Sequence, residues 1–389
     1  KVSVGDNGIY VYSEGAGINF TGNLLVKNQI GIFADGGSIN ASNSSITVQD
    51  GGIGIYVKEI VPSFGTTTID IHSGREDRYS IGVYYDSVPL IGTAPTITDT
   101  GDYTIGMMMN NSTGVTPYGF TIGNVGSHKI GLAAKGNSTL TVGGDITVNG
   151  DNNIGNYGEN SSITVNGDIL IGNSSEDNEL KKSSIGSYLK TGVYKGTGSL
   201  TVGNYGIGVY AEKLETGSTI TQTGSDMSVG KHGVGIFASG DSEVKLVMNN
   251  KIAISSENSV GVYTENVDSS VNGNMDIGSD SSIGILSLGT GNINYSGNID
   301  IADKNTAASA GIYKIGGTGI ITASGDWNIG ISGYGIYAQQ QTAATAKALD
   351  SITINNNADM TLGTSAIGIF SEGNNKVNNF GNIKVGATN

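Results

Sequence analysis

Ile30-Gly31-Ile32-Phe33-Ala34 is one copy of a string that recurs along the chain: an apolar residue, glycine, a second apolar residue, an aromatic residue, then a small or apolar residue. Clear further copies lie at 53–57, 207–211 and 234–238. We count fifteen copies at a mean spacing of about 26 residues, and their central glycines are Gly8, Gly31, Gly54, Gly82, Gly106, Gly131, Gly155, Gly186, Gly208, Gly235, Gly261, Gly284, Gly311, Gly335 and Gly368. A fixed period of this length is typical of a solenoid.

Two further runs of alternating apolar and polar residues separate successive copies, as at 138–142 and 144–148, and turn residues bound each run. Period-2 alternation predicts strands, and no long segment shows the helical period. Three strands per copy predict an all-β fold: a right-handed parallel β-helix with three faces and about 15 coils of about 26 residues, continuous over 1–389. The pattern leaves open on which side of its strand Trp327, the single tryptophan, lies.

Alternation also predicts which side chains face the core. We expect Ile30, Ile32 and Ala34 to point inward, and Gly31 and Phe33 to point outward, with their counterparts in every coil doing the same. The aromatic residues then form an external column beside a groove of glycines. Such a column either offers a platform for sugars or for a partner's apolar strip, or it stabilises the coil by stacking like residues on like.

Composition excludes several classes of protein. The 389 residues include 63 Gly but only 4 Pro, which excludes collagen, and 14% charged residues are too few for a solvated disordered chain. No apolar run is long enough for a membrane-spanning helix. The 20 basic residues face 34 acidic ones, which argues against a nucleic-acid partner. Without cysteine there is no disulfide and no thiolate metal site.

Catalysis has little support in the sequence. The three histidines, His72, His128 and His232, lie far apart in the repeat. Gly240-Asp241-Ser242 resembles the nucleophile string of serine-protease autotransporters, but Glu243 stands where those proteins have glycine. The aspartates that follow glycine occur singly, as turn residues do. We therefore predict a protein that is not an enzyme and that carries neither cofactor nor metal.

Binding residues are expected where the period is interrupted, because insertions in solenoids form loops on one face. Interruptions lie at 58–78, 86–102, 173–184 and 339–350, and the last of these has the composition of a short helix. Each is either a tolerated loop or a receptor site. The first two carry the candidate binding residues, two apolar tips among them: Pro62, Phe64, Arg75, Arg78, Pro89 and Leu90.

The repeated Ile-Gly-Ile-Tyr/Phe-Ala strings, together with Asn-Gly-Asp/Asn-Ile turns such as 166–169, cover essentially the whole chain. In these features the sequence resembles the passenger region of very large autotransporter adhesins of Gram-negative bacteria, most closely those of fusobacteria. The resemblance implies a secreted β-helical adhesin that is anchored at the outer membrane and displayed on the cell surface. Its partners would be receptors of host cells or of other bacteria, either proteins or glycans.

The signal peptide and the C-terminal translocator barrel of that family are not found in this sequence. We therefore expect a segment of a longer passenger, associated with a membrane only through such a barrel. The absence of cysteine agrees with export of an unfolded chain through a narrow pore. Two other functions stay open: a passive stalk that projects a distal binding domain, and, with less support, a carbohydrate-active β-helix.

Overall fold

Short alternating runs bounded by turn residues fold here into strands that pair with their counterparts one repeat later. The computed structural model describes residues 7–89, 95–116, 119–123, 125–176, 182–224, 226–241, 245–303, 307–340 and 351–386. Every regular element within these ranges is a β-strand, and the paired strands run parallel as a β-helix of about 14 turns. The predicted parallel β-helix is confirmed.

The chain divides into two compact units, each described by itself. Unit 1 comprises residues 1–175 and 181–189, and unit 2 comprises residues 176–180 and 190–389. The division falls within strand β19 (Ile185–Gly196). One uninterrupted coil over residues 1–389 stays a prediction.

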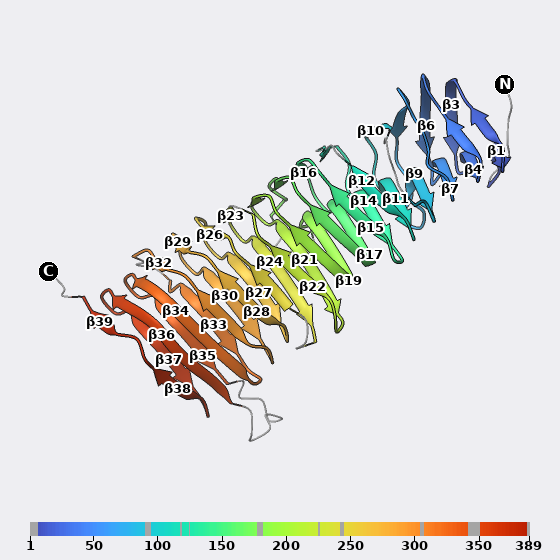
Figure 1. Ribbon diagram of the computed structural model, residues 1–389. Helices are drawn as coiled ribbons and strands as arrows, with labels where there is room; N and C mark the ends of the chain where they lie inside the picture. The colour runs from blue at the N-terminus through green and yellow to red at the C-terminus, as the bar shows by residue number, and fades with distance from the viewer. Residues whose placement is uncertain are drawn as a thin grey trace. The chain divides into compact units, whose positions relative to one another are not determined.

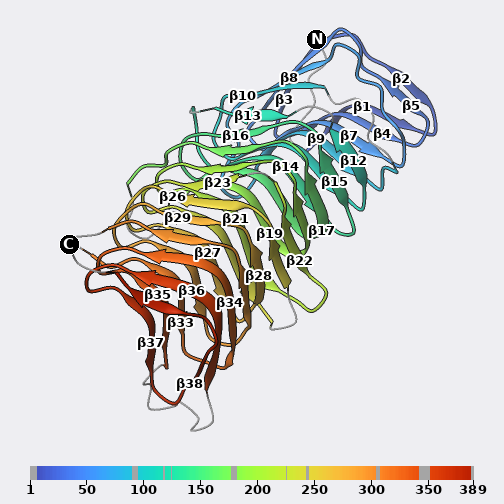
Figure 2. The ribbon, with the colours of Figure 1, turned by 60° about the vertical axis from the view of Figure 1, so that its left-hand side comes forward.

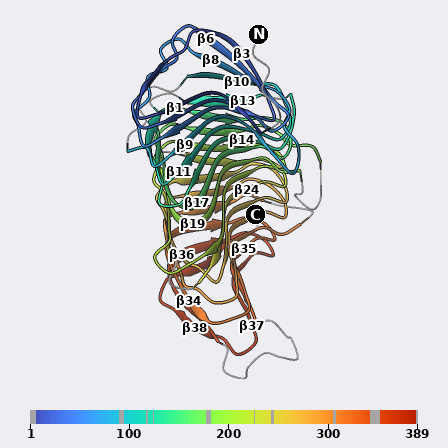
Figure 3. The ribbon, with the colours of Figure 1, turned by 90° about the vertical axis from the view of Figure 1, so that its right-hand side faces the viewer.

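In unit 1, each turn contributes a strand with the glycine string to the first face. These strands are β1 (Ile9–Glu14), β4 (Ile30–Asp35), β7 (Ile53–Lys58), β9 (Ser80–Asp86), β11 (Thr104–Asn110), β14 (Lys129–Lys135) and β17 (Ile154–Val165). The second face holds β2 (Gly17–Asn19) and β5 (Ser38–Asn40), which lie side by side in Figure 2, and then β12 (Thr113–Thr116), β15 (Thr139–Val142) and the end of β17. The third face begins with β3 (Gly22–Lys27), β6 (Ser44–Gln49), β8 (Thr68–Ile71) and β10 (Thr96–Asp99), grouped together in Figure 3, and continues with β13 (Phe120–Ile122), β16 (Ile146–Val148) and β18 (Ile169–Ile171).

Unit 2 repeats this plan, and Figure 1 shows its strands in order from green to red. Its first face holds β21 (Ile207–Leu214), β24 (Val234–Gly240), β27 (Val260–Glu265), β30 (Ile283–Leu288), β33 (Ala310–Ile315), β35 (Tyr334–Gln339) and β37 (Ile367–Glu372). The second face holds β22 (Thr219–Gln222), β25 (Lys245–Met248), β28 (Asp268–Asn272), β31 (Ile293–Ser296), the starts of β34 (Gly319–Ile329) and β36 (Ile352–Leu362), and β38 (Lys376–Asn379). The third face holds β20 (Leu200–Val202), β23 (Asp226–Val229), β26 (Lys251–Ile254), β29 (Met275–Ile277), β32 (Ile299–Ile301), the ends of β34 and β36, and β39 (Ile383–Val385).

The core confirms part of the predicted facing and corrects the rest. Ile32 and Ala34 are fully buried and Phe33 is half-buried on the outside, as expected. Gly31, however, faces inward: a Cβ there would lie 2.8 Å from Val26 Cγ2 and 2.5 Å from the Gly54 carbonyl oxygen. Ile30 correspondingly turns partly outward.

The predicted external groove of glycines is therefore wrong. In most strings two consecutive residues, the glycine and the following apolar residue, are buried, so strict alternation fails at this point. The physical reason is the close approach of the first face to the third face, which leaves no room for a side chain at the glycine.

Trp327 points inward, which settles the question that the pattern left open. It is 2% exposed, its Nε1 donates to the Gly297 carbonyl oxygen at 3.1 Å, and its ring meets that of Tyr295 edge to face. Such a partner for the indole N–H makes burial of tryptophan favourable.

One corner of the coil, directly before the first face, has a recurrent backbone conformation. We call it the entry corner. Its residues adopt left-handed φ values between 53° and 57° at Asn28, Tyr103, His128 and Asn152 of unit 1, and at Tyr205, His232, Asn258 and Ser281 of unit 2. Asparagine tolerates this conformation well. The column of such residues holds the side chains next to it at the same position in successive turns.

Candidate functional site

The predicted apolar tip at Phe64 does not exist. Phe64 is fully buried, Pro62 is buried as well, and the Phe64 ring meets that of the buried Tyr85 edge to face at 6.4 Å. Ser63 bridges to Asn40 of the second face, so Pro62 and Phe64 pack into the wall of the coil instead of projecting from it. The expectation of an exposed apolar tip at Phe64 is therefore wrong.

The predicted arginines lie on one short turn but have different surroundings. Arg78 Nη1 donates to Asn7 Oδ1 at 2.9 Å and also to Asn28 Oδ1, so it ties its own turn to two earlier turns. Arg75 is exposed and faces Asp77, with 3.5 Å between Nε and Oδ1. Pro89 is exposed, and Leu90 lies outside the described residues.

The other predicted interruptions are only partly described. Residues 90–94 of the second, 177–181 of the third and 341–350 of the fourth lie outside the described ranges, and so does most of the expected helix. Binding by residues in these regions stays a prediction.

The aromatic residues of the glycine strings do form outward columns, as predicted. In unit 1 the rings of Tyr12, Phe33, Tyr56 and Tyr84 stack in sequence, with centroids 4.7–5.3 Å apart. Each ring covers a face of its neighbour, so a sugar could stack only at the end of a column. This arrangement favours the structural interpretation of the column over the binding platform.

Several column tyrosines also donate to a carboxylate. Tyr263 donates to Glu265 at 2.7 Å, Tyr157 to Glu159 at 3.1 Å, and Tyr56 to Asp86 of the next turn at 2.9 Å. Burial and the nearby carboxylate raise the pKa of Tyr263 above its usual range. The column thus combines stacking of the rings with hydrogen bonds from tyrosine hydroxyls to aspartate and glutamate carboxylates.

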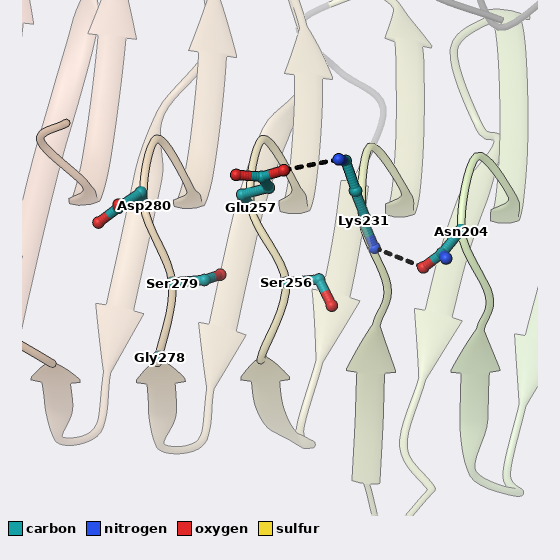
Figure 4. Close-up of a pocket in the computed structure, with 7 residues that line it drawn as sticks. All are labelled: Asn204, Lys231, Ser256, Glu257, Gly278, Ser279 and Asp280. Atoms are coloured by element: carbon teal, nitrogen blue, oxygen red, sulfur yellow. Dashed lines mark hydrogen bonds and ion pairs between the residues drawn. The ribbon is translucent and has the colours of Figure 1, made fainter. Parts of the chain in front are cut away.

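A polar depression of about 480 Å³ opens at the entry corner of unit 2 (Figure 4). Its lining comes from four successive turns: Asn204, Lys231, Ser256, Glu257, Gly278, Ser279 and Asp280. Backbone hydrogen bonds from Tyr205 to Lys231 (2.8 Å) and from His232 to Glu257 (3.1 Å) hold these turns together. The stacked rings of Tyr205 and His232, 4.9 Å apart, belong to the same corner.

An ion pair crosses the depression. Lys231 Nζ lies 2.6 Å from Glu257 Oε1, and the Lys231 main-chain N–H donates to Asn204 Oδ1 at 3.0 Å (Figure 4). The bond to Lys231 lowers the pKa of Glu257, and the bond to Glu257 raises the pKa of Lys231. Amide, hydroxyl, ammonium and carboxylate groups therefore lie together in the depression. Such a set of hydrogen-bond donors and acceptors suits a polar ligand.

Sequence reasoning missed this site because no segment of it is unusual. Asn204, Lys231, Glu257 and Asp280 are separated by one period each and stand directly before the entry-corner residues of their turns. Comparing residues at the same offset of the repeat would have brought them together.

Among the described residues, His128 does not form a catalytic triad with its neighbours. Ser127 lies between the other two groups, with its Oγ 2.9 Å from His128 Nδ1 and 3.4 Å from Asp102 Oδ1, whereas a triad needs the histidine in the middle. Ser242 of the nucleophile-like string lies outside the described residues. Within the described ranges no three histidine or acidic side chains gather closely enough to hold a metal ion.

Lys314 places an amine in the core of unit 2. Its Nζ donates to the carbonyl oxygens of Gly289 (2.9 Å) and Gly291 (3.0 Å) and contacts Ser287 Oγ at 3.4 Å. Burial lowers the pKa of Lys314 to about 8. The ammonium form is therefore disfavoured in the folded state.

This shift predicts a pH dependence of stability. Between the folded pKa of about 8 and the ordinary value of 10.5, the unfolded chain binds more protons than the folded chain, so the free energy of unfolding rises with pH. Relative to Lys314→Met, wild-type stability should increase by about 1 kcal/mol from about pH 7 to pH 9. Urea unfolding of both proteins at each pH measures the difference, and equal slopes for the two would contradict the burial effect.

Comparisons with known proteins add no relative. No protein-family model matches the chain, and searches of curated proteins and of solved structures gave no match. Over the residues that the structure describes, no helix has the length and apolar character needed to cross a membrane.

Proposed function

We propose that this chain is a passenger segment of an autotransporter adhesin, displayed on the bacterial surface and anchored at the outer membrane. It would bind a receptor, protein or glycan, on host cells or on other bacteria. The proposal rests on the resemblance of the glycine strings to that family. The observation that favours a receptor-binding segment over a passive stalk is the open polar depression formed by four turns of unit 2.

The chemistry of the depression supports a polar receptor group. Lys231 and Glu257 already neutralise each other, and Asp280 adds a further carboxylate, so an anionic ligand would meet no free excess of positive charge. Hydroxyl groups of a glycan or polar side chains of a protein can exchange hydrogen bonds with Asn204, Ser256 and Ser279 at such an open surface.

A passive stalk is the second candidate, and the regular stacking of the outer columns supports it. Within each unit, most of the outward-facing residues of the first face pair with a residue of the same type in the next turn, such as an aromatic residue with an aromatic residue. Such uniformity stabilises a rod, whereas a binding site differs locally from its surroundings.

An adhesion assay with matched variants tests the proposal. Lys231→Met with Glu257→Gln removes the ion pair of the depression, and we expect about a tenfold loss of binding to target cells. The control removes a similar pair between neighbouring turns outside the depression, Lys251→Met with Asp276→Asn, where Nζ and Oδ2 lie 2.5 Å apart. Adhesion of the control should equal that of the wild type.

Other outcomes oppose the proposal. Failure of the wild-type protein to bind any cell or glycan would favour the stalk. Equal losses of adhesion in both double variants would show that the depression is not the binding site. Release of oligosaccharide from a glycan would indicate an enzyme.

A further inference from the structure

Lys129 buries its amine against a carboxyl group of the preceding turn. It opens strand β14 and is fully buried, and its Nζ lies 3.4 Å from Asp99 Oδ1, at the end of β10. The same nitrogen donates to the main-chain oxygen of Asp99 at 3.0 Å. A Cβ at Gly126 would come within 2.9 Å of Lys129 Cε, so glycine there leaves room for the lysine side chain.

The Asp99 carboxyl is held by donors on both oxygens. The Gly101 N–H donates to Oδ1 at 3.3 Å, and Thr104 Oγ1 donates to Oδ2. Fixed donors of this kind stabilise the negative charge that develops on oxygen when a nucleophile adds to a carboxyl carbon. The arrangement therefore presents the carboxyl to the amine and polarises it at the same time.

Burial favours the uncharged form of the Asp99 carboxyl. Desolvation raises the pKa of Asp99, although Thr104 and Lys129 act in the opposite direction. Transfer of one proton from the ammonium to the carboxylate would give a neutral amine beside a neutral acid, with the Lys129 side chain fully buried and the Asp99 side chain 19% exposed. A neutral amine next to a carboxylic acid is the reactive combination for amide formation.

We propose that Lys129 and Asp99 form an isopeptide bond that joins two neighbouring turns of unit 1. Lys129 Nζ adds to Asp99 Cγ and gives a tetrahedral centre. Its two oxygens accept hydrogen bonds from the Gly101 N–H and from Thr104 Oγ1. One carboxyl oxygen then leaves as water with two protons, one from the amine and one from the acid. The product is an Nζ–Cγ amide, and the step needs no oxidant, reductant or co-reactant.

Lys314 is the built-in comparison. It is buried like Lys129, but its amine bonds to the carbonyl oxygens of Gly289 and Gly291 and to the Ser287 hydroxyl, none of which can be displaced to form an amide. Among the residues that the structure describes, one fully buried lysine has an electrophilic partner and one does not.

Mass spectrometry of the full-length chain tests the bond. The intact protein should weigh less than its sequence by one water. After denaturation and trypsin digestion, the bond at Lys129 should block cleavage, so that residues 79–135 remain one peptide, while cleavage after Lys314 proceeds normally. Asp99→Ala should restore full mass and cleavage at Lys129. Asp99→Asn should lose one ammonia instead of water, because the leaving group is then the amide nitrogen.

Two results would overturn the proposal. Full sequence mass with normal cleavage after Lys129 would show that the two side chains form only a buried ion pair. A loss of water with normal cleavage after Lys129 would place the dehydration elsewhere, for example in a succinimide. The Lys129→Gln variant, which must show full mass under the proposal, separates this bond from any other source of water loss.

Discussion

Substitution of alanine for Gly155 is expected to destabilise unit 1 by about 3 kcal/mol. The new Cβ would lie 2.4 Å from the Gly186 carbonyl oxygen, 2.9 Å from Ile146 Cγ2 and 3.0 Å from Val148 Cγ2. The first of these atoms belongs to the backbone of the next turn and cannot move without disturbing the strand pairing. Gly31, Gly54 and Gly106 have the same constraint, because a Cβ at each would lie 2.5–2.7 Å from the carbonyl oxygen of the glycine one turn later.

The matched control is Gly123→Ala, because a Cβ at Gly123 would meet no heavy atom within 4 Å. Its free energy of unfolding should stay within about 0.5 kcal/mol of the wild type. Thermal and urea unfolding measure both variants. Tolerance of Gly155→Ala would show that the glycines do not face the core.

Truncation of Phe64 should cost about 4 kcal/mol, because its ring is fully buried against Tyr85 and the cavity can collapse only in part. At a temperature where the variant is folded, adhesion should be unchanged, since the ring is not available to a receptor. Calorimetry measures the loss of stability, and the cell-binding assay measures adhesion.

Pro89→Ala provides the comparison for Phe64, because Pro89 is exposed in the neighbouring interruption. Its stability should match that of the wild type within about 0.5 kcal/mol. If Phe64→Ala abolished adhesion without lowering the unfolding temperature, an exposed position of Phe64 would be right and its burial wrong.

The repeat alone was sufficient to predict the architecture. One glycine string and two alternating runs per period lead directly to three parallel faces, and the outward position of Phe33 and the burial of Ile32 follow from alternation. The inward position of Gly31 could not be predicted in this way, because a period-2 pattern assumes that no two neighbouring residues share a side. The packing of the third face against the first decides that point, and it is a tertiary effect.

The candidate site was harder to predict for two reasons. The interruption of the period indicated a loop tip at Phe64, yet the bridge between Ser63 and Asn40 holds this part of the insertion against the wall. The depression of unit 2 arises from ordinary turn residues, such as Asn204 and Ser279, that only the stacking of turns brings together.

Disulfide trapping tests the parallel register of successive turns most directly, because the chain has no cysteine of its own. Asn294 and Thr322 are register partners on outward positions of β31 and β34, whereas Ser324 pairs with Ser296. Partners on adjacent parallel strands lie about 4.8 Å apart, within reach of a disulfide, and an offset of two residues increases the distance to about 8 Å. We predict rapid cross-linking of Asn294→Cys with Thr322→Cys and none of Asn294→Cys with Ser324→Cys. Preferential cross-linking of the offset pair would contradict the β-helix described for unit 2.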